Sequence, residues 1–109
     1  MLLTFIGKQT QGGGSPTLFA TDRSTYVVQG WKVPDHAASV EIPKKLLEHL
    51  VGRPRLAAML HDTGRDSYLL SGVPVTDTEA LAQMDIPGHE TCVEVGQLQG
   101  GDAGGVATG

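Results

Sequence analysis

Four histidines and one cysteine are the side chains best suited to metal binding or nucleophilic chemistry in this chain of 109 residues. His36 and His89 each follow a turn that contains a proline, and together with Cys92 they make one hypothetical metal site. The chain has no CxxC pair and no two histidines at the helical spacing that zinc sites use. His89 and Cys92 would also point to opposite faces of a shared strand. We therefore expect histidines that are hydrogen-bonded in turns, with no metal and no cofactor.

Cys92 is the candidate nucleophile. A reactive thiol needs a neighbouring base, and His89 is the nearest one in the sequence. Alternation along a strand places Cys92 on the face of Glu94 and opposite to Val93 and Val95. We favour a small residue packed within a sheet, and we keep a small hydrolase or thiol enzyme, using Cys92 and the histidines, as the third interpretation of function. A single cysteine also excludes a disulfide within the chain.

Four basic side chains gather within twelve residues, at Lys44, Lys45, Arg53 and Arg55. Such a cluster suits the phosphates of DNA or the acidic surface of a protein, and a solvated helix face is the simplest alternative. Residues 1–55 carry seven basic and four acidic side chains, whereas the rest of the chain carries one and eight. The net charge of −4 and the acidic second half favour a protein surface, including that of a second copy. We predict these four residues as the partner- or DNA-binding site.

The elements that position these residues are short strands and two short helices. Residues 38–42 alternate apolar and polar side chains, which is typical of a half-buried strand, and a helix is expected to begin at Pro43. Thr76 and Glu79 fit a capping box at the start of a second helix, over residues 77–84. The remaining strands are expected at residues 2–6, 17–21, 25–29, 56–60, 67–70 and 91–95. In this order the second strand pairs with the third, and the fourth with the fifth, as two hairpins.

The sequence contains an internal repeat. Residues 21–33 match residues 63–75 at five positions: Thr21/Thr63, Arg23/Arg65, Tyr26/Tyr68, Gly30/Gly72 and Val33/Val75. Residues 34–42 match residues 87–95 at four positions: Pro34/Pro87, His36/His89, Val40/Val93 and Glu41/Glu94. The second helix is then an insertion in the later copy, and chance similarity is the alternative. We predict an internal pseudo-twofold duplication, in which Tyr26 and Tyr68 occupy equivalent places.

Together these elements predict an α+β fold, a mostly antiparallel β barrel or sandwich with two short helices. Residues 1–96 are expected to form a single globular domain, and residues 97–109 a disordered, glycine-rich tail. Aromatic residues make up 5% of the chain, so the core is expected to be mostly aliphatic. Its expected members are Val28, Val40, Ile42, Leu46, Leu50, Leu69, Leu81 and Val93. No apolar run approaches the ~18 residues of a membrane span, and the start lacks the pattern of a signal peptide, so we expect a cytoplasmic protein with no membrane contact.

Part of the sequence carries the motif of a known class. The motif is a strand that ends in I-P-K, a helix with leucines, and a glycine before a hairpin, formed here by Ile42, Pro43, Lys44, Leu46, Leu50 and Gly52. Through it, residues 39–72 resemble the AbrB and MazE class of swapped-hairpin DNA-binding domains. The resemblance implies a dimer with interlocked strands whose basic residues meet DNA.

The chain as a whole, with LTFIGK near its start and YVVQGW further on, is similar to small uncharacterised bacterial proteins that accompany helix-turn-helix regulators. We therefore predict a non-enzymatic, small regulatory or protein-interaction protein that forms a homodimer and binds a protein such as a helix-turn-helix regulator. The second interpretation is an AbrB-like dimeric DNA-binding transcriptional regulator, which requires a continuous basic face. A protein-binding surface requires an exposed apolar patch or an open edge strand, and an enzyme requires a concave pocket with Cys92 or two histidines inside.

Overall fold

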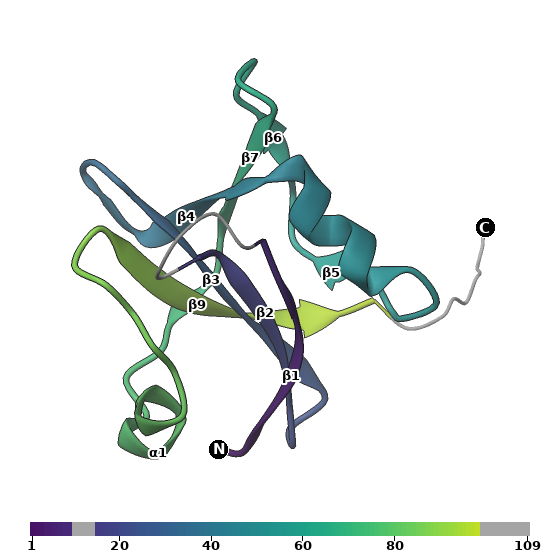
Figure 1. Cartoon of the computed structure of the whole chain (residues 1–109), viewed down its shortest axis with the longest axis vertical. Coiled ribbons are helices and arrows are strands. Elements are labelled where there is room, and N and C mark those ends of the chain that lie inside the picture. The colour runs from purple at the N-terminus through teal and green to yellow at the C-terminus, as the bar shows by residue number, and fades with distance from the viewer. Residues whose placement is uncertain (10–14, 99–109) are drawn as a thin grey trace.

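The structure, a computed structural model, describes residues 1–9 and 15–98 and is dominated by one antiparallel sheet (Figure 1). Within these residues the strands are β1 (Leu3–Lys8), β2 (Thr17–Thr21), β3 (Thr25–Val33), β4 (His36–Pro43), β5 (Leu56–Ala57), β6 (His61–Asp62), β7 (Ser67–Ser71), β8 (Val73–Pro74) and β9 (Glu90–Gln97). Two short helices accompany them, the 3₁₀ helix η1 (Lys44–Leu50) and α1 (Thr78–Ala82). The prediction of a mostly antiparallel, β-rich fold is confirmed.

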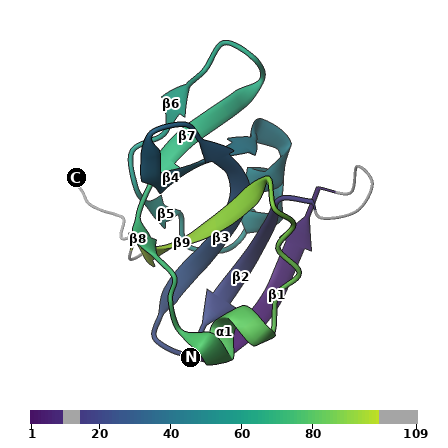
Figure 2. The ribbon, with the colours of Figure 1, turned by 90° about the vertical axis from the view of Figure 1, so that its left-hand side faces the viewer.

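The sheet is open and curved. Neighbouring strands follow the order β1-β2-β3-β4-β7-β6, and β9 lies beside β3, β5 and β8. Within the described residues no pairing joins β1 to β6, so of the two predicted architectures the closed barrel is wrong. The β6–β7 hairpin projects at one end of the molecule, and α1 lies at the other (Figure 2).

The long strand β3 organises the sheet and both apolar clusters. Its sequence, TYVVQGWKV, is rich in the β-branched and aromatic residues that favour strands. It pairs with β2 on one edge and with β9 along seven residues of the other. Because alternate side chains point to opposite faces, β3 contributes to a large cluster through Tyr26 and Val28 and to a small one through Val27. Phe19 and Cys92 complete the small cluster, which side chains of α1 and its flanking segments cover.

β4 leads directly into η1, as the sequence predicts, although the junction differs in detail. Pro43 has an extended backbone, with φ −66° and ψ 144°, and is the last residue of β4 rather than the first of the helix. The helix that follows is of the tighter 3₁₀ type over seven residues. Leu46 and Leu50 are buried, so the predicted apolar stripe still packs on the core.

The predicted second hairpin is wrong in its first strand. Leu56 pairs with Gln97 of β9, so the two-residue strand β5 belongs to another part of the sheet. β7 pairs with β6, His61–Asp62, two residues that the sequence predicts in the turn. The turn is therefore tighter than predicted, and it is closed by a hydrogen bond of 3.1 Å from the N–H of Thr63 to the carbonyl oxygen of Ser67.

The second helix is present but shorter than the predicted residues 77–84. Its N-cap is Asp77, whose carboxylate accepts a hydrogen bond from the N–H of Glu79 at 3.1 Å. The capping box assigned to Thr76 is therefore wrong, because the neighbouring aspartate takes the capping position. Ala80 is the buried residue of this helix.

Most of the predicted core is buried. Six of the eight expected residues are buried, namely Val28, Val40, Ile42, Leu46, Leu50 and Val93. Leu69 and Leu81 are only half-buried. In β7 the core is reached by Leu70, which lies opposite Val40 of β4, so alternation turns Leu69 to the other face. Leu81 packs instead against the small cluster.

β9 continues past residue 96, the predicted end of the domain. Gln97 pairs with Leu56, and the N–H of Leu98 donates a hydrogen bond of 2.9 Å to the carbonyl oxygen of Arg55. The first two residues of the predicted tail are therefore structured. Residues 99–109 of that tail, and residues 10–14 of the glycine-rich loop, lie outside the described residues.

The turn before β3 is held by a threonine and a glutamate. Thr21 Oγ1 accepts a hydrogen bond from the N–H of Arg23 at 3.1 Å and lies 2.6 Å from Thr25 Oγ1. Thr25 Oγ1 also donates to the carboxylate of Glu94 in β9 at 2.5 Å, and the Arg23 guanidinium forms an ion pair with the same carboxylate. Ser24, within the turn, has a positive φ of 58°.

The turn before β7 has the same contacts at the matching positions. Thr63 Oγ1 accepts a hydrogen bond from the N–H of Arg65 at 3.1 Å and lies 2.6 Å from Ser67 Oγ. Ser67 Oγ donates to the carboxylate of Glu41 in β4 at 2.5 Å, and the Arg65 guanidinium lies 3.1 Å from the same carboxylate. Asp66 has a positive φ of 63°, like the matching residue of the first turn.

The strands that follow these two turns are exchanged between the two halves of the chain. β3 runs along β9, and β7 runs along β4, so each hairpin strand pairs with a strand from the other half of the chain. Gly30, in β3, and Gly72, between β7 and β8, lie close to the backbone of another strand. A Cβ at Gly30 would be 2.6 Å from the carbonyl oxygen of Glu41, and a Cβ at Gly72 would be 2.5 Å from that of Glu94.

Candidate functional site

The helix η1 separates the four basic residues predicted as the binding site. At its start, Lys44 Nζ lies 2.6 Å from the carboxylate of Asp62 and 5.1 Å from the ring centre of Tyr68. The hydrogen bond between them raises the pKa of Lys44 and lowers that of Asp62. Arg53 and Arg55 follow the other end of the helix, and all of the four except Lys44 are exposed. In the part of the chain that the structure describes, those three form no ion pair.

An apolar groove lies between η1 and β5, beside the two arginines. Its volume is about 460 Å³, and its lining consists of Leu47, Leu50, Val51, Arg55, Leu56, Ala58, Leu60 and Leu98. Seven of these eight residues are apolar, and the arginine is the charged member of the described lining. We call this cavity the η1–β5 groove.

Apolar side chains that face solvent gather at the η1–β5 groove. Val51 is 85% exposed, Leu98 50% and Leu60 38%. Three of the seven large hydrophobic side chains exposed in residues 1–9 and 15–98 therefore line the groove, and a fourth, Met59, precedes Leu60 in the chain. A contiguous exposed apolar surface with a charged rim is typical of a protein-interaction site.

Backbone contacts fix the walls of this groove. The carbonyl oxygen of Pro54 accepts a hydrogen bond from the Tyr26 hydroxyl at 2.6 Å, and that of Arg55 accepts one from the N–H of Leu98. Gly52, with φ 83°, lets the chain turn after η1. The arginines are recognisable in the sequence, whereas the apolar wall is not, because it combines an irregular loop with a strand end and has no periodic pattern.

The histidines are dispersed. All four are exposed, and within the described residues no group of three His, Cys, Asp or Glu side chains is close enough to hold a metal ion. His36 lines a second cavity, of about 580 Å³, at the turn between β3 and β4. His89 Nε2 lies 3.5 Å from the buried carboxylate of Glu90, which accepts a hydrogen bond from Gln29 Nε2 at 2.7 Å. The hypothetical metal site of His36, His89 and Cys92 is therefore not assembled.

Cys92 is buried in the small cluster with Phe19 and Val27. It lies on the face opposite Val93 and Val95, as predicted. Burial raises the pKa of its thiol to about 11. Because the thiolate is the reactive form, this environment opposes thiol chemistry at neutral pH.

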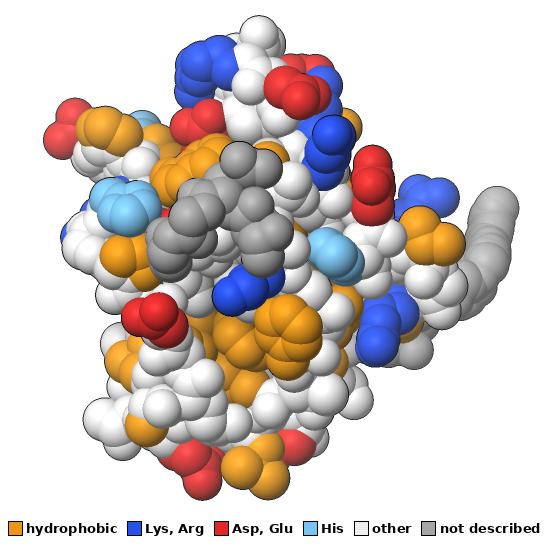
Figure 3. All heavy atoms as spheres, in the orientation of Figure 1, with side chains coloured by type: hydrophobic (Ala, Val, Ile, Leu, Met, Phe, Trp, Pro, Cys, Tyr) orange, Lys and Arg blue, Asp and Glu red, His pale blue; other side chains and the backbone are white. Residues whose placement is uncertain are grey.

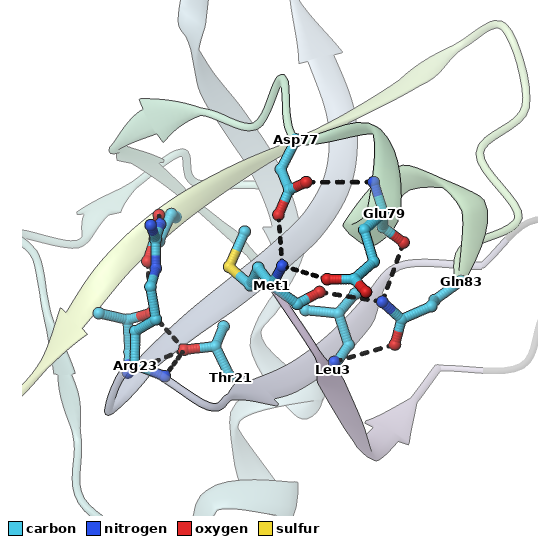
Figure 4. A network of polar contacts seen from close by, with 9 residues as sticks. Met1, Leu3, Thr21, Arg23, Asp77, Glu79 and Gln83 are labelled. Atoms are coloured by element: carbon cyan, nitrogen blue, oxygen red, sulfur yellow. Dashed lines mark hydrogen bonds and ion pairs between the residues drawn. The ribbon is translucent and has the colours of Figure 1, made fainter.

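The start of β1 is bound by residues at and near α1 (Figure 4). The amine of Met1 lies 2.7 Å from Asp77 and 2.5 Å from Glu79, and the hydrogen bonds to these carboxylates raise the pKa of the amine to about 10. The side chain of Gln83 accepts a hydrogen bond from the N–H of Leu3 at 2.9 Å and donates one to the carbonyl oxygen of Met1 at 3.0 Å. The Gln83 amide makes the backbone hydrogen bonds that a neighbouring strand would make, so the outer edge of β1 is covered at this end.

Basic and acidic side chains lie side by side on the face shown in Figure 3, and that face has no continuous basic surface. Within the described residues, no helix has the length and apolar character needed to span a membrane. No protein-family model, curated protein or solved structure matches the chain. Function is therefore argued from the geometry and chemistry of the site.

Proposed function

We propose that this chain is a non-enzymatic protein-interaction module whose η1–β5 groove binds an apolar segment of a protein partner. The observation that carries the proposal is the groove itself, with seven apolar lining residues beside the exposed Arg55. An amphipathic segment would bury its apolar side chains there and place a carboxylate against the guanidinium. A helix-turn-helix regulator is the partner that the sequence similarity suggests, and the cytoplasm is the location that we propose.

Two features support a protein partner over DNA. DNA affinity comes mainly from cations that meet phosphates, whereas the η1–β5 groove is apolar and presents one arginine from its described lining. Lys44, one of the predicted contacts, already pairs with Asp62. The buried thiol of Cys92 and the dispersed histidines support a role without catalysis.

Selection of random peptides displayed on phage, with the full chain as target, tests this proposal. We expect the enriched peptides to combine large apolar side chains with at least one carboxylate. Their affinity should fall at least about tenfold for Leu60→Asp, because a charge in an apolar groove is costly to desolvate. Val73→Asp is the matched control, since Val73 is 67% exposed and lies outside the groove, and it should leave binding unchanged. Peptides that bind both variants equally well would overturn the proposal.

The contribution of Arg55 to peptide binding can be tested separately. Arg55→Ala should weaken the selected peptides and remove most of the salt dependence of their binding, because an exposed ion pair is screened by salt. Arg65→Ala is the control, since Arg65 is equally cationic but pairs with Glu41 away from the groove. The same salt dependence in wild type and Arg55→Ala would show that the arginine does not meet the partner.

We further propose that the α+β fold, with its two short helices, is an internal duplication with pseudo-twofold symmetry. Support comes from the two turns with matching contacts, which hold Glu94 and Glu41. The exchange of strands between the halves also supports it. Tyr26 and Tyr68 are each the second residue of their strand, β3 and β7, and both contact the large cluster, although Tyr68 is less buried.

An AbrB-like DNA-binding regulator is the second candidate. The exchanged strands favour it, because the resemblance implies interlocked hairpins, which here would come from one chain. Titration of duplex DNA at low and moderate salt tests it. Tight binding that weakens steeply with salt and is lost in Lys44→Ala with Lys45→Ala would promote this candidate, whereas no binding at low salt would remove it.

A further inference from the structure

The outward face of β1 is a second exposed apolar surface, distinct from the η1–β5 groove. Phe5 is 57% exposed although it lies in the middle of the strand, and its ring meets that of Phe19 edge-on, with 6.2 Å between ring centres. Met1 and Leu3 pack on the same small cluster as Phe19. Figure 3 shows the apolar patch over β1 and β2, with a basic side chain above it and acidic side chains below. An aromatic ring left open among apolar neighbours indicates a surface that another molecule covers.

The two ends of this face carry opposite charge. Lys8 is exposed and lies three residues after Phe5, and among the described residues it forms no ion pair. At the other end, Asp77 and Glu79 share the single positive charge of the Met1 amine, which leaves one negative charge in excess. A surface with an aromatic centre, a cation at one end and an excess carboxylate at the other is complementary to itself after a twofold rotation.

Side chains are expected to make most of such a contact. The N–H of Leu3 that faces away from β2 is bound by Gln83. Gln83 thus covers the outer edge of β1 at Leu3, so pairing with another strand cannot extend along the whole of β1.

We propose that this β1 face is a homodimer interface. A second copy places its Phe5 against Phe5 of the first and its Lys8 against the carboxylates of Asp77 and Glu79, and the reverse contacts form at the same time. No described residue of β1 lines the η1–β5 groove, so each copy keeps its groove open for a partner. The dimer that the sequence predicts thereby acquires a defined surface, independent of the proposed partner site.

Sedimentation of the full chain over a range of concentrations, at low and moderate salt, tests this proposal. We expect a reversible dimer whose Kd rises with salt and rises at least about tenfold in Phe5→Asp. Lys8→Glu should weaken the dimer as well, since it brings like charges together at both ends. Val73→Asp, at a matched exposed position outside the face, and Leu60→Asp, in the groove, should leave the Kd unchanged.

Circular dichroism and melting identify any variant that fails to fold. If Phe5→Asp fails to fold, the Kd of Lys8→Glu decides the test, because Lys8 is exposed and forms no ion pair among the described residues. A wild-type chain that stays monomeric up to about 1 mM would overturn the proposal. So would a Kd that Lys8→Glu leaves unchanged, or one that Val73→Asp raises as much as Phe5→Asp does.

Discussion

Replacement of Gly30 by alanine should be costly, because the structure leaves no room for a side chain there. A Cβ would lie 2.6 Å from the carbonyl oxygen of Glu41 and 2.8 Å from Cγ2 of Ile42. Both residues belong to β4, which pairs with β3 next to this point, so the carbonyl group cannot withdraw without disturbing the ladder. Gly72 is in the same position relative to the carbonyl oxygen of Glu94, at 2.5 Å. In each case the two strands must separate to accept the methyl group.

Overpacking of this kind costs about 1–3 kcal/mol. Gly88→Ala is the matched control, because a Cβ at Gly88 would have nothing within 4 Å and its φ is not in the left-handed region. That change should be neutral, or stabilising by about 0.4–1 kcal/mol through the unfolded state. The free energies of unfolding of Gly30→Ala and Gly88→Ala should therefore differ by at least about 1 kcal/mol. For a domain of this size that difference corresponds to roughly 4–8 °C in melting temperature.

Thermal melting and urea denaturation, both followed by circular dichroism, measure these quantities. Gly30→Ala and Gly72→Ala should each melt well below Gly88→Ala, and by similar amounts. If Gly30→Ala melts together with Gly88→Ala, the close approach of β3 and β4 is wrong. If alanine is tolerated at one of the two positions, Gly30 or Gly72, and not at the other, the proposed equivalence of the two halves of the chain fails.

Three further predictions concern the stability of the fold and the reactivity of its cysteine. Leu46→Ala should lower the free energy of unfolding by about 2–5 kcal/mol, because Leu46 is fully buried, and an unchanged urea midpoint would show that η1 does not pack on the core. Because Asp77 and Glu79 raise the pKa of the Met1 amine from 8.0 to about 10, the amine should stabilise the fold fully below pH 8 and lose that contribution as the pH rises through 10. Glu79→Gln should flatten this decline of the urea midpoint, and an unaltered profile would contradict the contact. The Cys92 thiol, with a pKa raised to about 11, should react with an alkylating reagent at pH 8 far more slowly in the native chain than in urea, and equal rates would contradict its burial.

Much of the sheet could be predicted because its strands carry a local signal. The strand predicted at residues 17–21 is β2 without change, and the alternation of residues 38–42 marks the centre of β4. The hydroxyls that close the two turns belong to the repeat visible in the sequence, although the carboxylates that they hold lie in distant strands. Local pattern therefore locates a strand or a turn, and long-range pairing decides what it contacts.

The wrong predictions concern positions where two neighbouring residues suit the same role, or where a strand pairs with a distant part of the chain. Thr76 and Asp77 are adjacent and both suit an N-cap, and Asp77, which takes that position, also binds the Met1 amine. Leu56 has an apolar pattern that suits pairing with β7, yet it pairs with Gln97 far along the chain. The η1–β5 groove was missed for the same reason, because Leu98 joins its wall through a strand end.

Amide chemical-shift mapping tests the central claim most directly, with the isotope-labelled full chain titrated by the tightest peptide from the selection. If the η1–β5 groove is the protein-binding surface, the largest shifts should fall on Leu47, Leu60 and Leu98, and the Leu60→Asp variant should lose them at the same peptide concentration. Largest shifts around Lys44, or at the β3–β4 turn near His36, would contradict the claim.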